Sequence, residues 1–279
     1  MNKKLVVLSL SLGIFGVGST AFLGNQYSQA KAELQTGTTI EENKNVSKED
    51  IHYKMLNSID FFDKAKGNFV YGSVTADFHI DVEYQVKLKD GAASYYKAKD
   101  KNGIVTQSAA DGAVLTQLDD KDKTYVSFNI PKVKENPNKK SVESRYGKTQ
   151  DGKNEYSLRY DPSHMGVASN SLFSQNMALG FLEDYTKWSI KGEEKYLSLD
   201  SVVIEGTLND YYKEKHQAST FKFWVHKDTG ILLKMEEYNE KGEVVEYLIT
   251  ESIKLNETID EGKFKMKAPK EYKNKLADI

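Results

Sequence analysis

Apolar and polar residues alternate over residues 69–88 more regularly than anywhere else in the chain. Even positions from Val70 to Leu88 are apolar or small, and most odd positions between them are polar or charged. A period of two is typical of a β-strand with one buried face. Strands usually contain about 3–10 residues. The segment therefore predicts either two consecutive strands or one long strand that curves around a barrel or half-barrel.

Shorter alternating runs follow, separated by turn signals. A Lys-Asp-Gly turn ends at Gly91, and strands are then expected over 92–99, 103–108, 113–118 and 123–130. Residues 221–272 form a second series, in which two turns that end in Gly230 and Gly242 separate three strand-like runs. This series predicts an antiparallel meander with one buried face.

Two segments have the spacing of amphipathic helices. Ser47 is a candidate N-cap, and the apolar residues after it predict a helix near 48–65 that stops before Gly67. Residues 171–186 carry a second apolar stripe and predict a central helix. Residues 132–155, between the two series of strands, are the most polar internal stretch and predict a long exposed loop.

The beginning of the chain predicts export. Two lysines precede an almost uncharged apolar run, and small residues spaced for signal cleavage follow it. We expect residues 1–30 to be a secretion signal that is removed, with an uncleaved membrane anchor as the alternative. Residues 31–47 are polar and aperiodic and predict a flexible leader. A single domain is expected over 48–272, followed by a C-terminal tail over 273–279.

Composition excludes several kinds of chemistry. The chain has no Cys, which excludes disulfides, cysteine-bound metals, a thiol nucleophile and a lipid-modified N-terminal Cys. Without residues 1–30, which hold two lysines and no acids, 37 basic residues face 41 acidic residues, a net charge of −4. A mildly acidic protein has no general electrostatic reason to bind nucleic acid. We therefore expect an exported protein, in the cell envelope or secreted, that is not itself a lipoprotein and has no nucleic-acid partner.

One group of acidic residues and a histidine suggests a metal site. Asp77, His79, Asp81 and Glu83 share one face of the predicted strand, and their side chains are of the kind that binds divalent cations. A half-buried sheet also presents polar side chains of this kind to water. We interpret the group as a solvated outer face.

A second group suggests hydrolysis. Asp161, Ser163 and His164 are hydrolase residue types within four positions, but a catalytic triad is assembled from distant segments. The mature chain has no G-x-S-x-G nucleophile elbow. We interpret these residues as a loop, keep an exported hydrolase as a minor alternative, and predict no catalytic residue, no metal site and no cofactor.

The order of features in residues 221–272 is similar to that of a known family. Trp-Val-x-Lys-x-Thr-Gly at 224–230 leads into Ile-Leu-Leu, and an Asn-x-x-Gly turn, a long strand, an Ile-Asp pair, Phe264 and Pro269 follow. This order resembles the C-terminal half of the lipoprotein-localisation-factor superfamily, which includes the carrier LolA and the RseB/MucB regulators of sigma factors. A looser order of helix, long hairpins and central helix extends the resemblance over most of 48–272.

The resemblance implies an α+β fold, with a curved antiparallel sheet (an incomplete β-barrel) plugged by two or three helices. In that superfamily the hollow holds an apolar ligand, and there is no catalytic centre. The carrier branch holds lipoprotein acyl chains, whereas the regulator branch senses envelope components and controls a membrane-bound anti-sigma factor. The interior arginine of the carrier branch has no assignable counterpart among Arg145 and Arg159.

The leading hypothesis is therefore an exported, non-enzymatic protein that holds a lipid, an acylated species or another apolar ligand, as carrier or envelope sensor. The alternative is a protein-interaction module with a filled core, which regulates a membrane-bound, anti-sigma-type partner through the loop 132–155 or an edge strand. Under the first hypothesis ten residues are candidates for lining the cavity: Val74, Ala76, Phe78, Ile80, Val82, Tyr84, Trp188, Trp224, Leu233 and Tyr247.

Overall fold

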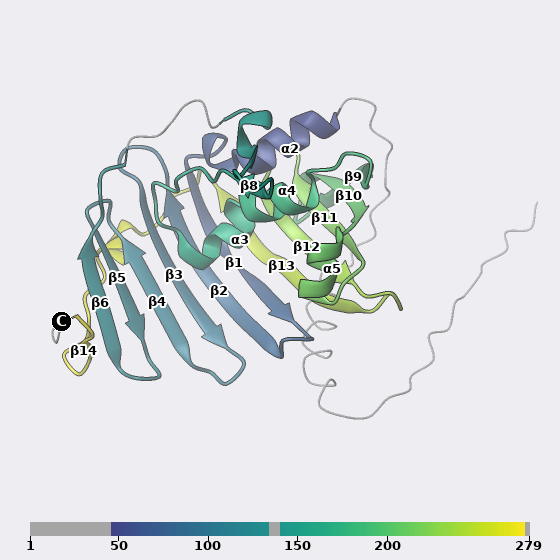
Figure 1. The fold of residues 1–279 in the computed structure, drawn as a ribbon. Helices are drawn as coiled ribbons and strands as arrows, with labels where there is room; N and C mark the ends of the chain where they lie inside the picture. The colour runs from purple at the N-terminus through teal and green to yellow at the C-terminus, as the bar shows by residue number, and fades with distance from the viewer. Residues whose placement is uncertain (1–45, 134–139, 277–279) are drawn as a thin grey trace, which may run out of the picture.

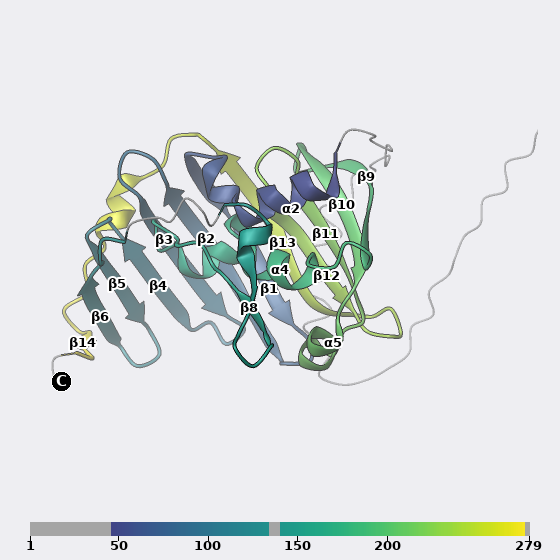
Figure 2. The ribbon, with the colours of Figure 1, turned by 45° about the horizontal axis from the view of Figure 1, so that its top comes forward.

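A twelve-stranded sheet dominates the computed structural model, which describes residues 46–133 and 140–276 (Figure 1). The strands follow the order β14-β6-β5-β4-β3-β2-β1-β13-β12-β11-β10-β9, and of the neighbouring pairs only β14 with β6 is parallel. The sheet curves without closing, because β14 and β9 lie at its two ends (Figure 2). The predicted fold class, α+β with a curved antiparallel sheet and a few helices, is confirmed.

The sheet consists of two series of strands that meet at β1 and β13. The first series is β1 (Lys64–Ser73), β2 (Phe78–Lys87), β3 (Ala93–Asp100), β4 (Val105–Ala110), β5 (Val114–Asp119) and β6 (Thr124–Asn129). The second series is β9 (Trp188–Tyr196), β10 (Leu199–Thr207), β11 (Thr220–His226), β12 (Leu232–Tyr238) and β13 (Val244–Leu255). The predicted hairpins and the C-terminal meander are therefore present, and the antiparallel pairing of β1 with β13 joins them.

The alternating segment 69–88 is two strands, with residues 74–77 as the turn between them. Each residue of β1 pairs with a residue of opposite parity in β2, as Tyr71 does with Ile80. Directly paired residues share a face of the sheet. The apolar face of β2 therefore continues on the odd positions of β1, and Val70 lies on the opposite face. The prediction that all the even positions share one face was wrong for this reason.

The first helix is shorter than predicted. α2 (Lys48–Leu56) begins after the predicted N-cap Ser47, whose hydroxyl accepts a hydrogen bond from a backbone amide of the first turn at 3.0 Å. A short 3₁₀ turn, η1 (Ser58–Asp60), follows it. Gly67 does not stop a helix but lies within β1, where a Cβ would come 2.1 Å from the carbonyl oxygen of Ser252 on β13. The glycine is thus required by the close approach of two strands.

A short helix that was not predicted, α5 (Asp210–His216), begins after Asn209, whose side chain caps its first turn.

The predicted central helix, 171–186, is divided. Three short segments occupy the place of the central helix: η4 (Gly166–Ala168), α3 (Ser169–Leu172) and α4 (Gln175–Phe181). None of the helices among the described residues is long and apolar enough to cross a membrane.

Both the predicted loop and the predicted C-terminal tail contain secondary structure. The loop 132–155 contributes η3 (Glu143–Arg145) and a separate two-stranded sheet of β7 (Tyr146–Lys148) and β8 (Asn154–Tyr156). The predicted tail contributes β14 (Lys273–Asn274), which pairs with β6. Just before it, η5 (Glu261–Lys265) packs Phe264 against the first series of strands.

The main hydrophobic core lies between the sheet and helices α2, α3 and α4, which rest in its curve (Figures 1 and 2). Met55 of α2, Leu172 of α3, Phe69 of β1 and Leu233 of β12 belong to one cluster and are fully buried. Both views show the helices over β1, β2 and β11–β13, whereas β4, β5 and β6 extend beyond them. Below, the inner face is the side of the sheet that carries the helices, and the wing is β3–β6.

Candidate ligand-binding face

The inner face beneath the helices is packed with side chains. Val82, Tyr84 and Leu233, three of the predicted cavity residues, are at most 1% exposed and belong to the main cluster, and Ile80 packs against its edge. Met55 and its neighbours on α2 belong to the same cluster. Three of these four candidates are therefore core residues between sheet and helix, and the fourth, Ile80, is half-buried beside them.

The two tryptophans have different places. Trp188 is buried in the main cluster, and its Nε1 donates a hydrogen bond to the carbonyl oxygen of Leu182 at 3.1 Å. Trp224 is also buried, but its ring lies beside lysines, with Lys234 Nζ 4.2 Å and Lys222 Nζ 5.0 Å from the ring centroid. Both rings are thus held by the protein's own groups, because each belongs to the main cluster and each lies beside a lysine, with Lys48 Nζ 4.9 Å from the ring centroid of Trp188.

The other four candidates lie away from the main core. Val74 and Tyr247 belong to a small cluster with Val70 on the outer face, where the Tyr247 hydroxyl is 2.9 Å from His79 Nδ1. Ala76 is exposed in the turn between β1 and β2, and Phe78 is 38% exposed where β2 begins. The turn reverses the chain, so that the even positions on its two sides point to opposite faces.

The inner face of the wing carries buried small and apolar side chains and, at its far end, one exposed aromatic ring. Tyr96 marks this face, because it packs against the main cluster, and a Cβ on Gly166 of η4 would lie 2.4 Å from its ring. Cross-strand pairing then carries two rows outward over β3, β4, β5 and β6: Ser94-Ala110-Leu115-Phe128 and Tyr96-Ser108-Gln117-Val126. Phe128, at the end of the first row, is 43% exposed. A hollow of 260 Å³ lies here, and Tyr96, Gln117 and Val126 are among its lining residues.

Both arginines of the chain are buried beside α2, which the sequence did not predict. Arg159 forms an ion pair with Asp60 and donates from Nη1 to Asn57 Oδ1 at 2.8 Å. Arg145 Nη1 donates to the carbonyl oxygen of Leu56 at 3.3 Å. Burial and the nearby Arg159 lower the pKa of Arg145 to about 10, so that it stays charged at neutral pH. The sequence did contain one signal for their burial: they are the only arginines in a lysine-rich chain, and the planar guanidinium group suits several hydrogen bonds in a buried place.

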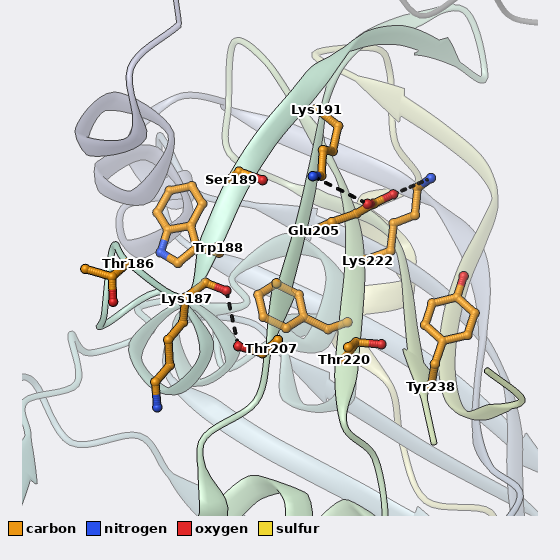
Figure 3. A pocket seen from close by; sticks show the side chains of 12 residues that line it. Thr186, Lys187, Trp188, Ser189, Lys191, Glu205, Thr207, Thr220, Lys222 and Tyr238 are labelled. Atoms are coloured by element: carbon orange, nitrogen blue, oxygen red, sulfur yellow. Dashed lines mark hydrogen bonds and ion pairs between the residues drawn. The ribbon is translucent and has the colours of Figure 1, made fainter. Parts of the chain in front are cut away.

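A larger and more polar pocket of 580 Å³ lies beside β9, β10 and β11 (Figure 3). Three lysines and one glutamate line it, and Glu205 lies between Lys222, at 2.9 Å, and Lys191, at 4.0 Å. Thr207 Oγ1 donates a weak hydrogen bond to the carbonyl oxygen of Lys187 at 3.4 Å. Such a lining suits a polar group better than an acyl chain.

The suspected hydrolase residues do not form a catalytic arrangement. The Ser163 hydroxyl donates to Asp161 Oδ1 at 2.8 Å, and Asp161 also accepts from the backbone of Met165. The ring of His164 faces a different residue, with Nε2 2.7 Å from the hydroxyl of Tyr160. The serine is thus bonded to the carboxylate that holds this turn, and the histidine is directed at a tyrosine instead.

The suspected metal ligands, which lie on β2 and in the turn before it, are each beside a partner. His79 Nε2 is 3.1 Å from Asp81 Oδ1. Asp77 contacts Lys101, and Glu83 contacts Lys263 at 2.5 Å. Lysines thus neutralise these carboxylates, but His79 is only 4% exposed, so the solvated-face interpretation was wrong for this residue.

The comparisons with protein-family models and with curated proteins found no match. Among solved structures, the chain is 16% identical to MucB in a complex of MucA and MucB from Pseudomonas aeruginosa, covering 80% of this chain and 62% of that one, with a TM-score of 0.46. It is 11% identical to lipoprotein LppX of Mycobacterium tuberculosis (76% and 97% covered, TM-score 0.37) and 11% identical to LprF of Mycobacterium bovis (81% and 97% covered, TM-score 0.39). The chain therefore spans less than two thirds of the MucB chain. These proteins include one of the regulators that the sequence resembles, and at these values the likeness concerns fold alone.

Proposed function

We propose that the protein is an exported, non-enzymatic binding protein whose ligand lies on the inner face of the wing. The observation that carries this proposal is the row of small and apolar side chains that runs from beneath the helices to the exposed ring of Phe128. Lone exposed apolar residues are common, but this one continues a row that is buried at Ala110 and Leu115. The fitting ligand is a lipid, an acylated species or another apolar chain.

The ligand site proposed here differs from the cavity that the sequence suggested. The helices and the sheet pack against each other where β1, β2 and β12 were expected to line a hollow. A chain on the wing would be covered from one side only. Full burial of a CH₂ group contributes about 0.8 kcal/mol, so one-sided contact contributes roughly half as much. Binding on the wing is therefore expected to be reversible, which suits an envelope sensor or a carrier that releases its ligand.

A second candidate function is a protein-interaction module with a filled core. The packing beneath the helices favours it, and so does the outer edge of β9, which pairs only with β10 among the described strands. An unpaired edge accepts an extended peptide as an additional strand. The partner would then be a membrane-bound regulatory protein, and no lipid would be required.

The deciding experiment is native mass spectrometry with solvent extraction, on the protein purified from the envelope of its own host. A lipid or acylated species near one per chain, lost in a Phe128→Asp variant, is the expected result. A mass without ligand, together with a membrane protein that crosslinks to β9, would overturn the proposal in favour of the interaction module. Lipid that is retained in Phe128→Asp would place the ligand elsewhere.

A further inference from the structure

Three potential metal ligands meet on the inner face, beneath α5. His216 is the last residue of α5, and Glu237 and Glu246 are directly paired across β12 and β13. His216 Nδ1 is 2.9 Å from Glu237 Oε2 and 3.5 Å from Glu246 Oε2, and the three ligand atoms lie within 4.8 Å of one another. This is the only such group with at least three ligands among residues 46–133 and 140–276.

The group contains two carboxylates but only one basic side chain, the histidine. Like charges directly opposite each other on neighbouring strands are destabilising, and here both glutamates are buried. Oε1 of Glu237 is itself buried and makes no hydrogen bond to any described residue. One imidazole neutralises one carboxylate at most, so that a buried acceptor is left without a donor. Burial accordingly raises the pKa of Glu237.

The surroundings already orient the other glutamate. The hydroxyl of Tyr71 on β1 donates to Glu246 Oε1 at 2.6 Å, which leaves Oε2 directed at the histidine. The rings of Phe181 and Tyr212 pack against His216, with centroids at 5.9 Å and 5.5 Å. A hydrogen bond to a ligating carboxylate and an apolar shell around the ligands are typical of protein metal sites.

We propose that His216, Glu237 and Glu246 bind a divalent transition-metal ion, with Zn²⁺ as the best match. One imidazole nitrogen with two carboxylates is a donor set that suits Zn²⁺, whereas Ca²⁺ and Mg²⁺ prefer oxygen ligands throughout. The ion balances both carboxylates at once and supplies the missing partner at the buried glutamate. Since its ligands come from α5 and from two strands, it fastens this helix to the sheet.

Equilibrium dialysis with Zn²⁺ alone tests the proposal, on EDTA-stripped protein without a polyhistidine tag. The expected result is one Zn²⁺ per chain, lost in His216→Gln and in Glu237→Gln, together with a Tm that rises with Zn²⁺ because the ion binds only the folded state. Tyr71→Phe is expected to weaken binding by about tenfold, since it removes only the bond that orients a ligand.

Asp81→Asn is the matched control, because Asp81 also contacts a histidine but has no second carboxylate beside it in the described structure. It is expected to leave the stoichiometry and the affinity unchanged. If Glu237→Gln does not fold, His216→Gln decides, because its helix lies at the surface and has no buried residue. Absence of stoichiometric Zn²⁺, or binding that survives both ligand variants, would overturn the proposal.

Discussion

Arg159 holds Asp60 through two parallel hydrogen bonds, from Nη1 to Oδ2 at 2.9 Å and from Nη2 to Oδ1 at 3.0 Å. The arginine follows β8, whereas the aspartate closes the turn after α2. The pair therefore ties the segment between the two series of strands to the N-terminal helix. A two-pronged arginine–carboxylate contact is among the strongest polar contacts that proteins make.

Replacement of Arg159 by Met is expected to lower the free energy of unfolding by about 3 kcal/mol, because it leaves a partly buried carboxylate without its main partner. Lys140→Met is the matched control. Lys140 Nζ contacts the same Asp60 at 2.9 Å but lies at the surface, so that its loss should cost less than about 1 kcal/mol. Urea denaturation measures both, and equal losses would contradict the assignment.

The same pair predicts a dependence on pH. Burial acts to raise the pKa of Asp60, but hydrogen bonds from Arg159 and Lys140 outweigh it and hold the pKa below the ordinary 3.8. The folded state therefore binds this proton less tightly than the unfolded state does. The stabilisation is complete above the ordinary pKa and is lost as pH falls through the lowered value. The difference in urea midpoint between the wild type and Asp60→Asn should be constant from pH 7 to about 5 and shrink below pH 4.

Phe128→Asp is expected to abolish retention of an apolar ligand without loss of stability, because the ring is at the open end of the wing. Phe78→Asp is the control, since that ring is similarly exposed but lies at the start of β2. Lipid extraction after purification compares the two. Equal loss of ligand in both variants would indicate a general effect of charge and not a site on the wing.

Ala76→Phe is expected to leave both stability and ligand content unchanged. If Ala76 lined a cavity, the change would displace the ligand. If Ala76 lay in a filled core, the change would lower the free energy of unfolding by about 1–3 kcal/mol. Because the residue is exposed in the turn 74–77, the change should alter the free energy of unfolding by less than about 0.5 kcal/mol. A larger loss in thermal denaturation would show that the turn packs against another part of the chain.

Tyr84→Phe is expected to stabilise the protein by about 1 kcal/mol, because the Tyr84 hydroxyl is buried without a hydrogen-bond partner among the described residues. Tyr196→Phe supplies the contrast. The Tyr196 hydroxyl donates to the carbonyl oxygen of Thr250 at 2.9 Å, and its removal should destabilise by about 1 kcal/mol. Chemical denaturation of the two variants decides, and destabilisation by both would mean that a ligand or water holds the Tyr84 hydroxyl.

Local patterns predicted the elements of the sheet better than the faces they present. Period-two alternation and Gly-ended turns located β2 to β6 and the meander, because both are properties of neighbouring residues. Which face a residue takes depends on how the chain reverses. The pairing of Tyr71 with Ile80 depends on the length of one turn, and a shift by one residue exchanges both faces. Val74 and Ala76 were misplaced for that reason.

The polar contacts of the interior were beyond local patterns. Arg159 and Asp60 are far apart in sequence, so no pattern of neighbouring residues indicates that the two are partners. The same holds for His216, whose partners lie on strands that follow a later turn. Glu237 pairs with Phe221 of β11 and with Glu246 of β13. This pairing places both glutamates on the buried side of the sheet, although charged side chains are usually exposed. Tertiary contacts thus bury charged residues that hydropathy alone predicts to be exposed to water.

The pairing of β1 with β13 also sets an order of events in folding. Ser73 pairs with Glu246 and Ala65 with Leu255, so the seam at the middle of the sheet joins residues that are separated by most of the chain. Hairpins of each series form from neighbouring strands, but the seam closes only after β13 has left the ribosome. Until then two half-sheets would each display a free edge and an uncovered apolar face. Closing a loop of this length is slow, and a chaperone that shields either half during that interval would raise the yield of folded protein.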